Sequence, residues 1–193
     1  MKKRVYGVAL MAVLIFFSVV IMILPTFSSD ANSRYETKQE IRLPLVLNDD
    51  KDIKLIFFGY SGCSDICAPR LEDLSKIYAG LDDSLKKRVG VEFLDISTPY
   101  DTTLPQIFAT YFHKDFKGIY LDDKVLRSYT KEFSVYFSKS LVDEGEFNHT
   151  TYLYIAKRDG SKKFIRYIYN AYPYSEEQIV KDLRGLVNEN SAK

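Results

Sequence analysis

Cysteine and histidine are scarce in this chain, which has two of each among 193 residues and no tryptophan. Two cysteines exclude a framework of several disulfide bonds and a zinc site built from four thiolates. The charges nearly cancel, with 27 lysines and arginines against 26 aspartates and glutamates. The chain therefore lacks the basic excess expected of a nucleic-acid-binding protein. Any chemistry that needs a thiol or an imidazole must use these few residues.

Charge is absent from residues 5–24, VYGVALMAVLIFFSVVIMIL, which follow Lys2, Lys3 and Arg4. About 20 apolar residues in a helix span about 30 Å, the thickness of the hydrocarbon core of a membrane. The stretch exceeds the apolar region of a cleavable signal peptide and no convincing cleavage site follows, so residues 1–24 are predicted to be a transmembrane anchor, with cleavage as the alternative. The positive-inside bias keeps the N-terminus cytoplasmic and puts the remaining chain on the periplasmic or outer side of the plasma (inner) membrane, where thiols can be oxidised.

The remaining sequence predicts a polar tether at 25–40 and one domain at 41–193. Short apolar or alternating runs, typical of strands, interleave with amphipathic helical patterns in the first part of the domain. A hairpin pattern and a final helix follow. This order predicts an α/β fold, a thioredoxin-like sandwich with an insertion between the second strand and the hairpin. The predicted strands are 41–47, 53–60, 89–96, 116–121, 133–141, 151–157 and 164–169, and the predicted helices are 65–87, 104–112, 122–132 and 175–189.

Cys63 and Cys67 lie four residues apart in GYSGCSDICAP, between the predicted strand 53–60 and the helix that follows it. This spacing brings both side chains onto one helical face, one turn apart. A helix N-terminus favours the thiolate, which is the form that binds metals or attacks a disulfide. Cα atoms one turn apart can also be joined by a disulfide, although so short a loop would stabilise the fold little. The pair therefore predicts a metal site or a redox-active dithiol, with a purely structural disulfide as the alternative.

His149 lies in FNHTT, just before the predicted strand 151–157. Two thiolates and one imidazole form a soft set of ligands that suits Cu(I), and with an added oxygen they could hold Cu(II). Structural zinc usually takes four ligands, and a carboxylate such as Asp65 could supply the fourth. The second histidine, His113, follows a predicted helix and is expected to interact with the helix end or to pack against it. The sequence therefore predicts one copper site, with zinc as an alternative.

Four segments of the chain resemble, in the right order, the signature segments of the Sco/SenC family of membrane-anchored copper proteins with a thioredoxin-like fold. By this resemblance Cys63, Cys67 and His149 match the family's copper ligands. Asp65 matches the aspartate inside the family's CPDVC motif, a group expected to support the ligands. The likeness covers about residues 53–170, and its segments are FFGYSGCSDICAPRLEDLSKIY, LDISTPYDT, ATYFHKDFKGIYL and FNHTTYLYIAKRDG.

The resemblance implies delivery of copper to the binuclear copper centre of cytochrome c oxidase, or reduction of the cysteines of that centre before loading. The expected partner is the copper-bearing subunit of the oxidase or another copper protein. The chain departs from the family pattern at Ser64 and Ala68, where the family has prolines, and at Asn148, where it usually has aspartate. These changes concern the surroundings of the ligands rather than the ligands themselves.

The leading prediction is a membrane-anchored copper metallochaperone rather than an enzyme, and other functions stay open. The main alternative is a thiol–disulfide oxidoreductase whose redox pair is Cys63 and Cys67. A copper or redox sensor is a further possibility, as is a peroxidase that uses Arg70 beside a reactive thiol. The tyrosine-rich segment 165–174 is explained equally well as a partner surface or as hairpin packing.

Overall fold

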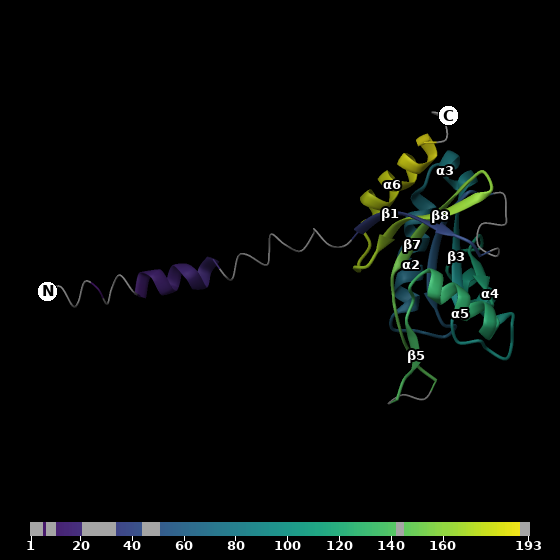
Figure 1. Cartoon of the computed structure of the whole chain (residues 1–193), viewed down its shortest axis with the longest axis horizontal. Coiled ribbons are helices and arrows are strands. Elements are labelled where there is room, and N and C mark those ends of the chain that lie inside the picture. Colours follow the sequence, from purple (N-terminus) through teal and green to yellow (C-terminus); the bar gives the residue numbers. More distant parts are fainter. Residues whose placement is uncertain (1–5, 7–10, 21–33, 44–50, 142–144, 190–193) are drawn as a thin grey trace. The chain divides into compact units, whose positions relative to one another are not determined.

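The computed structural model divides the chain into two compact units, Met1–Ser33 and Arg34–Lys193 (Figure 1). The structure describes residues 6, 11–20, 34–43, 51–141 and 145–189. Within the apolar stretch 5–24, residues 11–20 are helical, while 7–10 and 21–24 lie outside the described part. Within the described residues, no helix is both long enough and apolar enough to cross a membrane.

The second unit is built on a six-stranded mixed sheet in the order β1-β8-β7-β2-β3-β4. β2, β3 and β4 run parallel, whereas β7 pairs with β2, β8 pairs with β7 and β1 pairs with β8, each in antiparallel fashion. β5 and β6 form a separate two-stranded sheet, called the β5–β6 ribbon below. The strands are β1 Arg34–Ile41, β2 Ile53–Gly59, β3 Val89–Asp95, β4 Lys117–Ile119, β5 Phe137–Lys139, β6 Phe147–His149, β7 Leu153–Asp159 and β8 Lys162–Tyr169.

Helices connect the parallel strands and follow the hairpin. α2 and α3 lie between β2 and β3 in the chain, α4 lies between β3 and β4, and α6 follows β8 and packs beside α3. Parallel strands joined through helices and extended by an antiparallel hairpin form a thioredoxin-type α/β fold with a mixed sheet, as the sequence predicts. The helices are α2 Cys67–Gly80, α3 Asp83–Arg88, α4 Leu104–Phe112, α5 Asp123–Glu132 and α6 Glu176–Glu189.

The core lies around β2 and β3, in which every residue is buried. Strands covered on both faces carry continuous apolar runs, and this explains why both were predictable from sequence. The two runs also contain a buried ion pair, because Lys54 Nζ lies 3.0 Å from Glu92 Oε1. In the tyrosine-rich segment Tyr167 and Tyr169 are buried, so packing of the hairpin accounts for them.

The N-terminal edge of the sheet differs from the sequence prediction. Residues 34–41 form β1, although the sequence predicts a polar tether up to residue 40. Most of β1 is exposed, and an exposed edge strand can be polar throughout, so its sequence has no apolar alternation. Residues 44–47 of the predicted strand 41–47 lie outside the described residues.

The helix predicted at 65–87 is instead two helices. α2 ends at Gly80, and Leu81 has an extended backbone. Asp82 then caps α3 by accepting a hydrogen bond from Leu85 N at 3.0 Å, a typical N-terminal signal. The extended stretch predicted at 133–141 contains only the short strand β5, and its partner β6 was not predicted as a strand. The strands near 53–60 and 89–96, the hairpin and the helices near 104–112, 122–132 and 175–189 are confirmed.

Candidate metal site

The segment from Tyr60 to Cys67, called the cysteine loop below, connects β2 to α2. Gly62 has a φ of +92°, a left-handed conformation that favours glycine. The backbone N–H of Cys63 donates to Tyr60 O at 3.2 Å and closes a tight turn around this glycine. The turn directs both thiols inward, so that Cys63 is 3% exposed and Cys67 is fully buried.

The end of β3 fixes this loop from the neighbouring strand. The buried carboxylate of Asp95 accepts hydrogen bonds from the N–H and hydroxyl of Ser61, at 2.8 and 2.5 Å, and from the same groups of Ser97, at 2.7 and 2.5 Å. Gly59 makes room for the second thiol, because a Cβ there would lie 2.6 Å from Cys67 Sγ. The sulfur atoms are therefore held by buried contacts of the main sheet.

The third residue of the site comes from the β5–β6 ribbon. His149 ends β6, and its Nδ1 lies 3.0 Å from Thr150 O. A carbonyl accepts only from a protonated Nδ1, so this contact assigns the tautomer and leaves Nε2 as the free ligand atom. Nε2 lies 3.9 Å from Cys67 Sγ, and the imidazole meets the Tyr60 ring edge-on at 5.9 Å. The ligand atoms of the two cysteines and the histidine all lie within 4.8 Å of one another.

The two thiols have opposite pKa shifts. The pKa of Cys63 is lowered, chiefly because its sulfur accepts a hydrogen bond from the Cys67 thiol. The pKa of Cys67 is raised because its proton is held by the Cys63 sulfur and because the group is buried. Cys63 Sγ also accepts from Cys67 N at 3.4 Å, at a helix start where Ile66 provides no cap. These opposite directions favour a thiolate on Cys63 beside a thiol on Cys67.

The other sequence candidates lie outside this group. Asp65 is exposed, and its carboxylate accepts a hydrogen bond from Ser64 Oγ at 2.7 Å. His113 is the C-cap of α4, with its ring 5.0 Å from that of Tyr78 and 5.2 Å from that of Phe116. The structure therefore brings together Cys63, Cys67 and His149 and does not bring Asp65 to them.

Three side chains that sequence reasoning did not place at a metal site border it. The Tyr60 hydroxyl donates to the Glu146 carboxylate, and burial together with this bond raises the pKa of Tyr60. The Arg70 guanidinium donates to Thr151 Oγ1 at 3.3 Å and lies 4.5 Å from the ring of Tyr172. Arg70 could have been placed from its position one helical turn after Cys67. No sequence pattern points to Glu146, because it directly precedes β6, a strand that the sequence does not predict.

The donor set and its spacing fit a soft metal ion. Two sulfur atoms that each bind a metal at about 2.3 Å can be no more than about 4.6 Å apart. The ligand atoms of the site are already within 4.8 Å of one another, so a small decrease in these distances would let all three bind one metal ion. Thiolate and imidazole ligands suit copper in its reduced state and also zinc. Three close ligands with a largely buried pair of sulfurs favour a low-coordinate ion.

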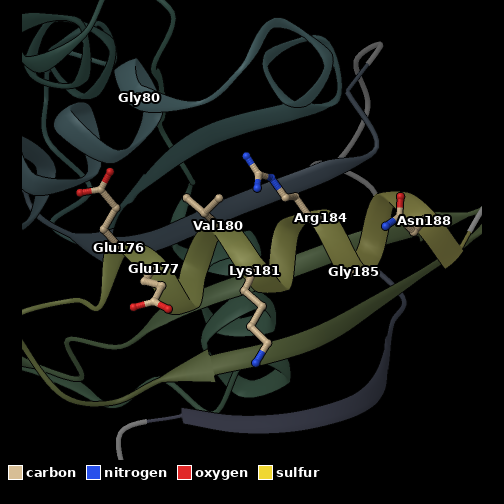
Figure 2. A pocket seen from close by; sticks show the side chains of 8 residues that line it. All are labelled: Gly80, Glu176, Glu177, Val180, Lys181, Arg184, Gly185 and Asn188. Carbon is tan, nitrogen blue, oxygen red and sulfur yellow. The ribbon is translucent and has the colours of Figure 1, made fainter.

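A second concave region lies along α6, away from these residues (Figure 2). It has a volume of about 870 Å³ and includes Gly80 at the end of α2. Figure 2 shows Val180 and Arg184 on the side of α6 toward Gly80, with Glu177 and Lys181 on the other side. Its lining contains neither a cysteine nor a histidine, so it offers no soft ligand.

Comparison with known proteins places the chain in a family. The SCO1/SenC family model matches residues 50–188, which is more than half of the chain. A SCO2-like protein of Rickettsia conorii is 25% identical over 134 residues, which are 64% of this chain and 63% of the relative. The match therefore spans less than two thirds of that relative's length.

Two solved structures share the fold. Apo Sco1 of Thermus thermophilus has a TM-score of 0.62 at 22% identity, covering 79% of this chain and 92% of its own. Bradyrhizobium japonicum ScoI, solved with copper bound, has a TM-score of 0.59 at 23% identity, covering 71% of this chain and 87% of its own. These likenesses concern the fold, whereas the family model matches the sequence itself. Together with the convergence of the two cysteines and the histidine, the match shows that the chain belongs to the SCO1/SenC family.

Proposed function

We propose that this protein binds one copper ion through Cys63, Cys67 and His149 and delivers it to another copper protein. The observation that carries the proposal is the convergence of two sulfurs and one imidazole nitrogen within 4.8 Å, in a member of the SCO1/SenC family. Cu(I) is the ion that this soft set of ligands suits best. The copper bound to the B. japonicum relative supports the choice of metal.

The exposure of the three ligands gives an order for copper transfer. Copper leaves by ligand exchange, in which an incoming thiolate or imidazole of the partner replaces one ligand at a time. Cys67 is fully buried and Cys63 is 3% exposed, whereas His149 is half-buried. The incoming ligand therefore reaches the metal on the His149 side. Loss of the neutral imidazole leaves the charge of the copper–dithiolate unit unchanged, whereas loss of a thiolate would change it.

The proposed partner is the copper-bearing subunit of cytochrome c oxidase or another copper protein at the membrane. We also propose that residues 5–24 anchor the chain in the plasma (inner) membrane, with the folded unit on the periplasmic or outer side. The uncharged stretch after three basic residues supports the anchor. Arg34, the first residue of β1, pairs in one row with Tyr169, Leu153 and Phe57. This row lies near the end of the sheet at which β2 ends and the cysteine loop begins.

The opposite pKa shifts of the two thiols favour a second candidate, a thiol–disulfide oxidoreductase. The Cys63 thiolate would attack a partner's disulfide, forming a mixed disulfide and releasing one partner thiolate. Cys67, after losing its proton, would then attack the Cys63 sulfur and release the second partner thiolate. The chain would end with a Cys63–Cys67 disulfide, and the partner would gain two electrons. This reaction does not require the imidazole of His149.

Competition for Cu(I) tests the proposal. The reduced, full-length chain in detergent competes with a chromogenic chelator in the absence of oxygen, beside Cys63→Ser, His149→Ala and the control His113→Ala. We expect tight 1:1 binding that the first two substitutions weaken and the control does not. Unchanged affinity in His149→Ala would refute the third ligand. No competitive binding, with Cys63 and Cys67 still cycling to a disulfide, would establish the oxidoreductase instead.

A further inference from the structure

The β5–β6 ribbon that carries His149 is not part of the main sheet. Figure 1 shows β5 extending away from the body of the domain. Just beyond the ends of its strands, Thr150 N donates to Tyr136 O at 2.9 Å and Ser140 N donates to Glu146 O at 2.8 Å. A two-stranded hairpin is only marginally stable on its own in water. Contacts with the rest of the domain must therefore hold the ribbon in place.

Tyr60 provides three of these contacts from a fixed position at the end of β2. Its hydroxyl donates to the Glu146 carboxylate. Its ring lies 5.3 Å from that of Phe147 and 5.9 Å from that of His149, between ring centroids. Tyr60 is only 5% exposed, and its carbonyl accepts the Cys63 N–H that closes the cysteine loop. One buried side chain thus contacts two residues of β6 and Glu146, which directly precedes that strand.

We propose that Tyr60 and Glu146 form a clasp that holds the β5–β6 ribbon against the cysteine loop and so positions His149. The hydrogen bond to a carboxylate is charge-assisted and stronger than one between neutral groups. The Phe147 and His149 contacts set the angle at which the ribbon lies on Tyr60. When the clasp is broken, the ribbon moves off the loop and Nε2 leaves the sulfurs. The inference deepens the proposed function, on which its copper measurement rests.

The exposure of Glu146 separates positioning from folding. Its side chain lies at the surface, so its truncation leaves no cavity in the core. Glu146 is also three residues away from His149 in sequence and does not ligate. Glu146→Ala therefore tests the clasp without removing a ligand. Glu146→Gln is the matched variant, because its carboxamide oxygen still accepts from the Tyr60 hydroxyl.

A metal-free measurement tests the clasp independently of copper. The chain has two histidines, so a reduced, histidine-labelled full-length sample in detergent gives two sets of imidazole NMR signals. His149 lies edge-on to the Tyr60 ring and is shifted by its ring current, while His113 packs on Tyr78 and Phe116 and is the internal reference. We expect Glu146→Ala to move the His149 signals toward those of a free imidazole, Glu146→Gln to keep them, and His113 to stay unchanged. Unmoved His149 signals in Glu146→Ala, or equal movement in both variants, would overturn the clasp.

Copper affinity then tests positioning. We expect Glu146→Ala to weaken Cu(I) binding by about tenfold, Glu146→Gln to restore most of it, and Glu146→Ala to add nothing in a His149→Ala background. A further loss in that background, or full affinity in Glu146→Ala when His149→Ala alone weakens binding, would overturn the positioning role. If His149→Ala itself leaves copper affinity unchanged, the proposed function fails, and the imidazole signals alone decide the clasp.

Discussion

The cysteine loop and the β5–β6 ribbon meet at one site but are supported in different ways. The loop continues β2, a strand in which every residue is buried, and the buried Asp95 binds it through two hydrogen bonds from Ser61. The ribbon consists of two strands of three residues each, and none of these residues is fully buried. The two thiols therefore share the stability of the core, whereas the imidazole depends on a few local contacts.

This difference fits the proposed transfer of copper to a partner. Two ligands that belong to the core keep hold of the ion while the protein is alone. A third ligand on a weakly supported element can be displaced by a partner without unfolding the domain. Displacement of His149 is thus a separate event from unfolding of the core. Substitutions in the core and in the ribbon should therefore have different consequences.

The largest effect should come from breaking the buried ion pair between β2 and β3. Glu92→Ala leaves the Lys54 ammonium without its partner carboxylate in the core, where Lys54 is 1% exposed. We expect the free energy of unfolding to fall by about 3–5 kcal/mol, measured by denaturant titration. The double variant Lys54→Met with Glu92→Leu, which removes both charges, should recover most of the loss. An unchanged midpoint in Glu92→Ala would show that the core does not depend on this pair.

Gly59→Ala should disturb the core and the site together. The new Cβ would lie 2.6 Å from Cys67 Sγ and 2.9 Å from the ring of Phe93. Overpacking of this kind costs about 1–3 kcal/mol, and we expect weaker Cu(I) binding because the sulfur must move. Gly185→Ala is the control, since nothing lies within 4 Å of the corresponding Cβ in α6. It should raise stability by up to about 1 kcal/mol. Equal copper affinity in both variants would contradict the tight fit around Cys67.

The same contrast explains which parts of the structure could be predicted from sequence. β2 and β3 are continuous apolar runs, and the cysteine pair follows one of them, so the fold and the position of the thiols had local signals. β1 is a polar edge strand whose conformation is set by pairing with β8. β6 is three residues long and has no periodicity to detect. The Tyr60–Glu146 contact joins residues 86 positions apart, which no local pattern encodes.

A smaller effect is expected from a change inside the ribbon. Thr150→Val keeps the shape of the side chain but removes the Oγ1 that accepts from Tyr136 N at 3.0 Å. We expect a loss of about 1 kcal/mol that is local to the ribbon. Amide hydrogen exchange at Tyr136 should quicken by about fivefold, while exchange in β2 and the melting temperature stay unchanged. Thr110→Val, in the exposed part of α4, is the control. Faster exchange throughout the core would mean that ribbon and core unfold as one unit.

The smallest effect is expected when acid protonates Glu189 at the end of α6. Arg166 donates two hydrogen bonds of 2.7 Å to Glu189, and Lys157 donates another of 3.1 Å. These contacts hold the pKa of Glu189 at about 2, below its ordinary value of 4.5. Because the folded-state pKa is the lower one, the stabilisation is complete above about pH 4.5 and is lost as the pH falls toward 2. Glu189 is 44% exposed, so solvent screening limits it to about 1 kcal/mol or less.

Unfolding curves between pH 6 and pH 2.5 measure this contribution. Glu189→Gln should be less stable than the wild type at pH 6, and the two should converge as the pH falls, because below about pH 4.5 the unfolded wild-type chain takes up a proton at Glu189 that the folded chain does not. Glu177→Gln, in the first turn of the same helix, provides the control and should run parallel to the wild type. A constant difference between Glu189→Gln and the wild type over this range would mean that Glu189 acts through packing rather than through its charge. Convergence would show that the ion pairs of Glu189 in α6 account for part of the loss of stability in acid, independently of the metal site.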